Sequence, residues 1–72
     1  MVHMTKRQFE MVLNFNEDTM AYVEGLYVKV NAPQSYIPYI EKLCEEFDFE
    51  IISKAEDGED EGYYHLIIRE LA

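Results

Sequence analysis

Cysteine, histidine and glycine are scarce in this sequence, and each shortage excludes a class of site. The 72 residues include one cysteine, two histidines and three glycines. One cysteine cannot form an internal disulfide, and one cysteine with two histidines gives too few ligands for a structural zinc site. Three scattered glycines leave no glycine-rich loop that could cradle a phosphate. We therefore expect no cofactor and no structural metal.

Long hydrophobic runs are also missing. No stretch approaches the roughly 18 apolar residues of a membrane span, and no hydrophobic segment follows the basic N-terminus. We therefore expect a soluble, cytoplasmic protein, and a lone Cys44 agrees with a reducing compartment. Residues 1–7 are expected to be flexible or derived from expression, and residues 1–3, which precede Met4, are expected to have no function, as a remnant of expression or of an alternative start.

The sequence does contain enough apolar material for a packed core. Hydrophobic residues make up 49% of the chain, and its aromatic residues are six tyrosines and four phenylalanines. This composition is far above that of a disordered acidic segment, so the negative charge does not indicate disorder. We expect a single domain over residues 1–72. Domains of this size that lack disulfides and structural metal ions commonly gain stability by self-association.

Basic residues are few, and the acidic residues are concentrated in one third of the chain. Six lysines and arginines stand against fifteen aspartates and glutamates, which gives a formal net charge of −9 at pH 7. Residues 41–61 carry −8 of this charge, from ten acids and two lysines. Such a surface repels nucleic acids and anionic membranes and attracts basic proteins. The acids could equally serve only to keep a small apolar domain soluble.

Two strands are predicted in the first half of the chain. Residues 8–15 alternate as in a half-buried strand, with apolar side chains on one face: Phe9, Met11, Leu13 and Phe15. Residues 16–19 are typical of a turn, and residues 20–30 are rich in β-branched and aromatic side chains, which predicts a second strand of the same hairpin. Gly25 inside that strand indicates a bulge or a close backbone approach.

One helix and two further strands are predicted in the second half. After a connection at residues 31–35, Ser35 is a suitable N-cap for a helix from Tyr36 to about Asp48. Its apolar stripe recurs at spacings of three and four residues: Tyr36, Ile37, Ile40, Leu43, Cys44 and Phe47. Strands are predicted at 49–54 and 63–71, on either side of a long acidic turn.

The predicted fold is therefore α+β, in the order ββαββ. It is a four-stranded, mainly antiparallel sheet with one helix packed on one face. The second sheet face would then have no cover from the chain, and an uncovered apolar face commonly marks an interface. Four residues are expected on that face: Val12, Tyr27, Tyr63 and Ile67.

The acidic residues of the predicted helix and turn form the candidate partner-binding site. Glu41, Glu45 and Asp48 stand at i, i+4 and i+7, which places three carboxylates in one stripe about 6 Å apart. That spacing is close to the roughly 6–7 Å between successive phosphates of a nucleic-acid strand, so a DNA-mimicking surface is geometrically allowed. An ordinary solvent-facing helix surface is the more common meaning of such a stripe. The turn supplies the remaining candidates: Glu56, Asp57, Glu59, Asp60 and Glu61.

Other chemistry is weakly indicated. The turn resembles the first half of an EF-hand loop, but Ile68 stands where that loop needs a bidentate carboxylate, so at most a weak cation site is expected. His65 beside two tyrosines is a candidate general base, although no nucleophile motif accompanies it. Cys44 belongs to the apolar helical stripe, which predicts a buried, inert thiol. No catalytic or metal-binding residue is therefore predicted.

These observations favour a non-enzymatic interaction protein that engages a basic surface on a protein partner. Its concrete version is an inhibitor that occupies a nucleic-acid-binding surface. Small phage-encoded inhibitors, including anti-CRISPR and anti-restriction proteins, are similar to this chain in size and charge, and the similarity is one of composition only. The alternative is a homodimeric assembly module that buries its open sheet face and uses the acids only for solubility. A third hypothesis is a small enzyme or cation-dependent protein centred on His65.

Overall fold

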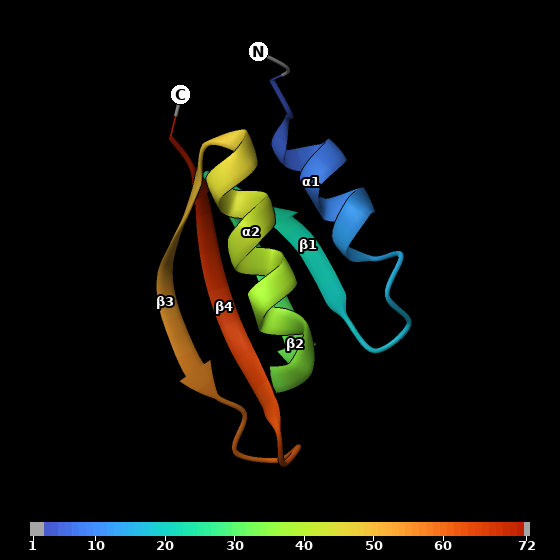
Figure 1. Ribbon diagram of the computed structural model, residues 1–72. Helices are drawn as coiled ribbons and strands as arrows, with labels where there is room; N and C mark the ends of the chain where they lie inside the picture. Colours follow the sequence, from blue (N-terminus) through green and yellow to red (C-terminus); the bar gives the residue numbers. More distant parts are fainter. Residues whose placement is uncertain (1–2, 72) are drawn as a thin grey trace.

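Two helices and four strands follow one another in the computed structural model, which describes residues 3–71 (Figure 1). Their order along the chain is αββαββ, with a short 3₁₀ turn before the second helix. The elements are α1 (Lys6–Leu13), β1 (Met20–Glu24), β2 (Tyr27–Pro33), η1 (Gln34–Tyr36), α2 (Ile37–Phe47), β3 (Phe49–Glu56) and β4 (Tyr63–Glu70).

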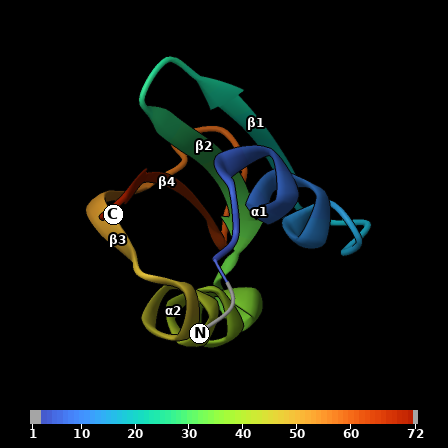
Figure 2. The same cartoon turned by 90° about the horizontal axis from the view of Figure 1, so that it is seen from above.

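The four strands form one sheet in the order β1-β2-β4-β3, and every neighbouring pair is antiparallel. Both helices lie on the same face of this sheet (Figure 2). Helix α1 packs against β1 and β2, and α2 packs against β3. The α+β class and the four-stranded antiparallel sheet are thus confirmed, but the sheet is covered by two helices, not one.

The predicted strand at residues 8–15 is wrong, because α1 occupies that segment. Phe9 and Leu13 stand four residues apart, and both are fully buried on one side of the helix. Met11 and Phe15, which the alternation placed beside them, are 61% and 83% exposed. The pattern of every second residue was therefore a coincidence, and the pair at i and i+4 was the real signal.

A capping box fixes the start of α1. Oγ1 of Thr5 accepts a hydrogen bond from the Gln8 N–H at 3.1 Å, and Oε1 of Gln8 accepts one from the Thr5 N–H at 2.9 Å. These bonds satisfy two amides at the helix entrance. Thr5 therefore has a structural role within residues 1–7, the segment expected to be flexible or derived from expression. Residues 1 and 2 lie outside the described residues.

The single strand predicted at residues 20–30 is also wrong, because a tight hairpin divides it into β1 and β2. Glu24 pairs with Tyr27, so the loop contains only Gly25 and Leu26. Gly25 has a φ of +60° at the first loop position, where a type II′ hairpin turn requires a positive φ. The glycine marks this turn and not a bulge, since it alone takes that conformation without steric cost.

The predicted helix is confirmed as α2, with slightly shorter bounds. Ser35, the predicted N-cap, lies in the preceding 3₁₀ turn, and no side-chain hydrogen bond caps α2 at Tyr36. Pro38 falls in the first helical turn, where its missing N–H costs little. The longer helix has 11 residues, and no helix within residues 3–71 is long and apolar enough to cross a membrane.

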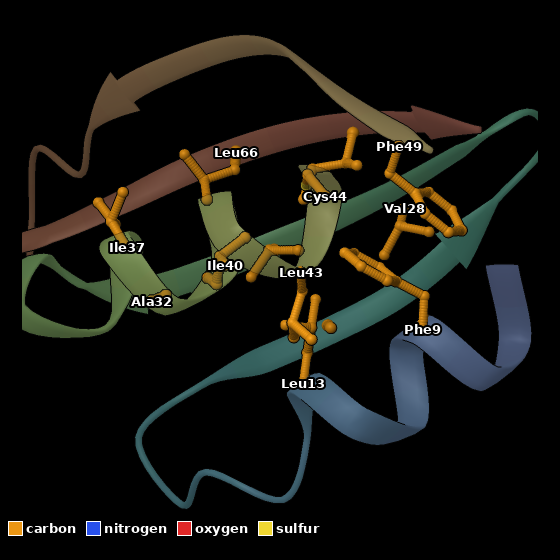
Figure 3. Packing of buried hydrophobic residues seen from close by; sticks show 13 residues of the cluster. Phe9, Leu13, Val28, Ala32, Ile37, Ile40, Leu43, Cys44, Phe49 and Leu66 are labelled. Carbon is orange, nitrogen blue, oxygen red and sulfur yellow. The ribbon is translucent and has the colours of Figure 1, made fainter. Parts of the chain in front are cut away.

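The core lies between the helices and the sheet (Figure 3). Much of the predicted apolar stripe of α2 is buried there: Ile37, Ile40, Leu43 and Cys44. The rings of Phe9 on α1 and Phe49 on β3 stack with centroids 4.2 Å apart, which joins α1 to the strand that follows α2. The central strands contribute three further core residues with at most 1% of their surface exposed: Val28, Leu66 and Ile68.

The two outer strands are protected in different ways. Side chains of α1 cover the outer edge of β1, where Asn14 bonds both backbone groups of Ala21 and Glu10 accepts the Val23 N–H at 3.1 Å. The other edge, β3, shifts register between Ile51 and Ser53. Covered edges and bulges are both ways of blocking edge-to-edge strand pairing.

Candidate interaction surface

The predicted partner-binding acids fall into two groups along β3. Asp48 directly precedes that strand and Glu56 ends it, so these two acids lie at most about 26 Å apart at about 3.3 Å per residue. Helix α2 runs beside the strand with its N-terminal end toward the acidic turn (Figure 1). We call the eight predicted residues the acidic surface: Glu41, Glu45, Asp48, Glu56, Asp57, Glu59, Asp60 and Glu61.

Seven of these eight side chains are exposed and lack an ion-pair partner among the described residues. The exception is Asp57. Three of the six basic residues form ion pairs outside the acidic surface: Lys6 with Glu70, Lys29 with Glu24, and Arg69 with Glu50. The negative charge of the seven carboxylates is therefore not offset by direct contacts, which leaves it available to a partner of opposite sign.

Asp57 differs from the other seven acids because it holds the turn together. Its Oδ1 accepts the Glu59 N–H at 2.9 Å, and its Oδ2 accepts Nδ2 of Asn31 at 3.0 Å and lies 3.3 Å from His65 Nε2. The side chain is only 13% exposed. The Glu59 amide first, and then Asn31, hold the pKa of Asp57 below its usual value of 3.8. This carboxylate therefore organises the site more than it presents charge.

The C-terminal end of α2 carries acids where helix electrostatics disfavour them. Glu45, Glu46 and Asp48 occupy or follow the last turn, which has no basic residue. Because the C-terminus of a helix carries partial negative charge, a carboxylate there costs about 0.3–1 kcal/mol. Asp48 also adopts a left-handed φ of 58°, a conformation that favours glycine. This end of α2 is thus more acidic and more strained than stability alone requires.

The sheet face opposite the helices has no cover from residues 3–71, and we call it the open face. The strand pairing places its side chains in three rows across the sheet: Glu24, Tyr27, Arg69, Glu50; Tyr22, Lys29, Ile67, Ser53; and Met20, Asn31, His65, Ala55. A groove of about 370 Å³ lies over the second and third rows. Tyr27, Tyr63 and Ile67 lie on this face as expected, whereas Val12 lies on α1 against the core.

The other residues considered for catalysis or metal binding, His65 and Cys44, make contacts typical of structural residues. His65 contacts the side chains of Asp57 and Asn31. Cys44 is buried as predicted, and burial first, then the charge of Glu41, raises the pKa of its thiol to about 12. Within residues 3–71, no three His, Cys, Asp or Glu side chains converge as ligands of a metal ion would.

Comparisons with protein-family models, with curated proteins and with solved structures found no match for this chain. The assignment of the acidic surface and the open face therefore depends on the residues and contacts described above. The sequence located the acidic surface from charge alone. It missed Met20, Tyr22 and Lys29 of the open face, because their side of the sheet follows from a hairpin that was not recognised.

Proposed function

We propose that the protein is a non-enzymatic binding module whose acidic surface engages a basic surface on a protein partner. One observation carries the proposal. Seven exposed carboxylates of the acidic surface lack an internal ion pair among the described residues, while Lys6, Lys29 and Arg69 are paired elsewhere. Unpaired charge of one sign raises the association rate with an oppositely charged partner and sets the orientation of approach.

The cost of the acids at the end of α2 supports the same proposal. Carboxylates at Glu45 and Asp48 reduce helix stability by about 0.3–1 kcal/mol each, and lysine there would add to it. Residues that break a local stability rule are most often found at functional sites. A surface needed only for solubility could place its acids near helix N-termini, where they would stabilise the fold.

The concrete form of the proposal is occupation of a nucleic-acid-binding surface on the partner. Glu41 and Glu45 are exposed one helical turn apart, which gives a charge spacing of about 6 Å along α2. This spacing is near that of successive phosphates, so lysines and arginines placed to contact a nucleic-acid backbone would also meet these carboxylates. The similarity of size and charge to small phage-encoded inhibitors agrees with this form of the proposal.

The proposal is tested by affinity capture with charge-matched variants. The wild-type chain is immobilised and incubated with a lysate of its source cells at about 50 mM and about 300 mM salt, and retained proteins are identified by mass spectrometry. The test variant is Glu41→Gln/Glu45→Gln. The matched control, Glu17→Gln/Asp18→Asn, removes the same charge from the exposed loop between α1 and β1.

The expected result is a basic, nucleic-acid-binding protein that the wild type and the control retain at low salt and that the test variant loses. Added DNA should displace that protein, because both ligands occupy one surface. Equal retention by the test variant and the control would show that the α2 carboxylates do not carry binding. A partner whose retention does not change with salt or with added DNA would also contradict the proposal.

A further inference from the structure

The open face differs from the rest of this acidic molecule because its charges are balanced. The rows of the open face contain two acids, Glu24 and Glu50, and two permanent cations, Lys29 and Arg69. The pairs are formed within the face itself. Lys29 Nζ lies 2.6 Å from Glu24 Oε1, and Arg69 Nη2 lies 2.8 Å from Glu50 Oε1. The net charge of −9 is therefore carried outside these rows.

The open face also exposes large apolar side chains. Met20 is 69% exposed and Tyr22 is 46% exposed on the edge strand β1. Tyr27 and Ile67 extend the apolar surface onto the central strands β2 and β4. Together with the stem of Lys29, these groups line or border the groove of about 370 Å³. Exposed apolar side chains that lie beside polar ones and paired charges are typical of a protein interface.

We propose that the open face binds the open face of a second copy of this chain, forming a two-layered sandwich of sheets. The balanced charge of the open face favours a second copy as its partner. Two copies with a net charge of −9 each repel one another, and the open face lets them approach without bringing unpaired carboxylates together. A strongly basic partner would instead be drawn to the acidic surface, away from a face whose permanent charges are already paired.

The edges of the sheet favour stacking over extension. Asn14 and Glu10 already bond three backbone groups on the outer edge of β1, namely the N–H and carbonyl of Ala21 and the N–H of Val23. The register shift after Ile51 interrupts the other edge, in β3. A second copy therefore lacks a regular, free strand edge on which to continue the sheet, and the face remains the larger self-complementary surface.

The size of the open face is of the order that a stable dimer needs. Strands of five, seven, eight and eight residues, spaced about 4.8 Å apart and rising about 3.3 Å per residue, cover about 440 Å² in projection. Side chains make the accessible area larger than the projection, toward the roughly 800 Å² per partner of a standard interface. That is about one sixth of the 4910 Å² exposed by the monomer.

The inference is tested by the oligomeric state of the full chain in solution. Sedimentation and light scattering are measured from about 1 µM to about 300 µM for the wild type and two variants. The test variant, Met20→Glu/Tyr22→Glu, adds two charges to the open face. The matched control, Met11→Glu/Phe15→Glu, adds the same charges to exposed apolar residues of the helical side. Circular dichroism checks that both variants fold.

The wild type and the control should be dimers at tens of micromolar, and the test variant should dissociate at least about tenfold more readily. Added salt should strengthen the dimer, because it screens repulsion between the two acidic copies. A wild type that stays monomeric at about 300 µM would overturn the inference, and so would a dimer that only the control disrupts.

A measurement on the wild type alone covers the case of a test variant that does not fold. Amide chemical shifts recorded during dilution should change most on the open face, around Tyr22, Lys29 and Ile67, and shifts confined to α1 or α2 would contradict the inference. Its outcome is also independent of the proposed function, because Glu41→Gln/Glu45→Gln should weaken partner capture without weakening the dimer.

Discussion

The side chain of Asn14 pairs with the backbone of Ala21 as a neighbouring strand would. Its Oδ1 accepts the Ala21 N–H at 2.8 Å, and its Nδ2 donates to the Ala21 carbonyl at 2.9 Å. Asn14 is the C-cap of α1, so one residue ends the helix and closes the edge of the sheet. The N-terminal helix, which has no counterpart in the predicted fold, is thereby tied to β1 by polar contacts as well as by its buried face.

Replacing Asn14 with alanine should lower the free energy of unfolding by about 1–3 kcal/mol, because both backbone groups of Ala21 lose their partners. Urea denaturation measures the loss. Asn16→Ala is the matched control, since it removes a single hydrogen bond to the exposed Asp18 amide and should cost well under 1 kcal/mol. Similar losses in both variants would mean that the Asn14 contacts contribute little.

Asp48→Gly should stabilise the protein for two reasons, loss of the carboxylate and relief of the backbone conformation. Asp48→Ala tests the first reason alone. Both substitutions remove a carboxylate from the C-terminal end of α2, but only glycine relieves the left-handed φ of 58°. Asp48→Gly should therefore unfold at a higher urea concentration than Asp48→Ala, by about 1 kcal/mol. Equal stability of the two variants would contradict a backbone cost at this position. If the acidic surface is functional, the stabilised glycine variant should bind the partner more weakly.

Asp57 should make the protein sensitive to acid. Its pKa is lower in the folded chain than the usual 3.8, so its stabilising effect is present at neutral pH and is lost as the pH falls through that lowered value. Unfolding of the wild type and of Asp57→Asn is compared between about pH 6 and about pH 2. The difference in stability should be largest near neutrality and shrink toward the acid end. Glu59→Gln, in the same turn, is the control, and an equal pH dependence of its difference would argue against a specific role for Asp57.

The thiol of Cys44 should resist alkylation until the protein unfolds. With a pKa of about 12, the folded thiol is ionised at pH 8 in only about one part in ten thousand, and its side chain is buried among α2 core residues. Iodoacetamide labelling followed by mass spectrometry should be slow in native buffer and rapid in guanidinium chloride. Equal labelling rates in the two conditions would show that Cys44 is accessible in the folded state.

The second half of the fold could be predicted because its signals were independent of tertiary contacts. The stripe of Ile37, Ile40 and Leu43 has helical spacing, and Pro38 allows only one register for the helix start. Strands β3 and β4 followed from β-branched runs on either side of a polar turn. In each case the local pattern and the global fold agree.

The first half was mispredicted because two patterns overlapped. Phe9 and Leu13 satisfy both alternation and helical spacing, and the exposed Met11 and Phe15 made alternation look stronger. The capping box of Thr5 and Gln8 was the local signal for a helix. A short run of residues 8–15 cannot by itself separate the two structures.

The candidate sites also divide into features that the sequence predicts and features that depend on tertiary contacts. Charge along the chain was sufficient to locate the acidic surface, because acids on a helix and in a turn are exposed in almost any fold. It could not reveal that Asp57 is held by Asn31 and His65, because Asn31 lies 26 residues from Asp57 and 34 residues from His65 in the sequence. The rows of the open face likewise depend on strand pairing, which the sequence specifies only through a correctly placed hairpin.

Binding through the acidic surface is best tested by the affinity for the captured partner as a function of salt. The dissociation constant of the purified pair is measured from about 50 mM to about 500 mM salt for the wild type, Glu41→Gln/Glu45→Gln and the loop control Glu17→Gln/Asp18→Asn. The wild type and the control should lose affinity steeply as salt rises, and the test variant should bind more weakly with a shallower slope. A salt-independent affinity, equal in all three proteins, would contradict the claim that the acidic surface binds the partner.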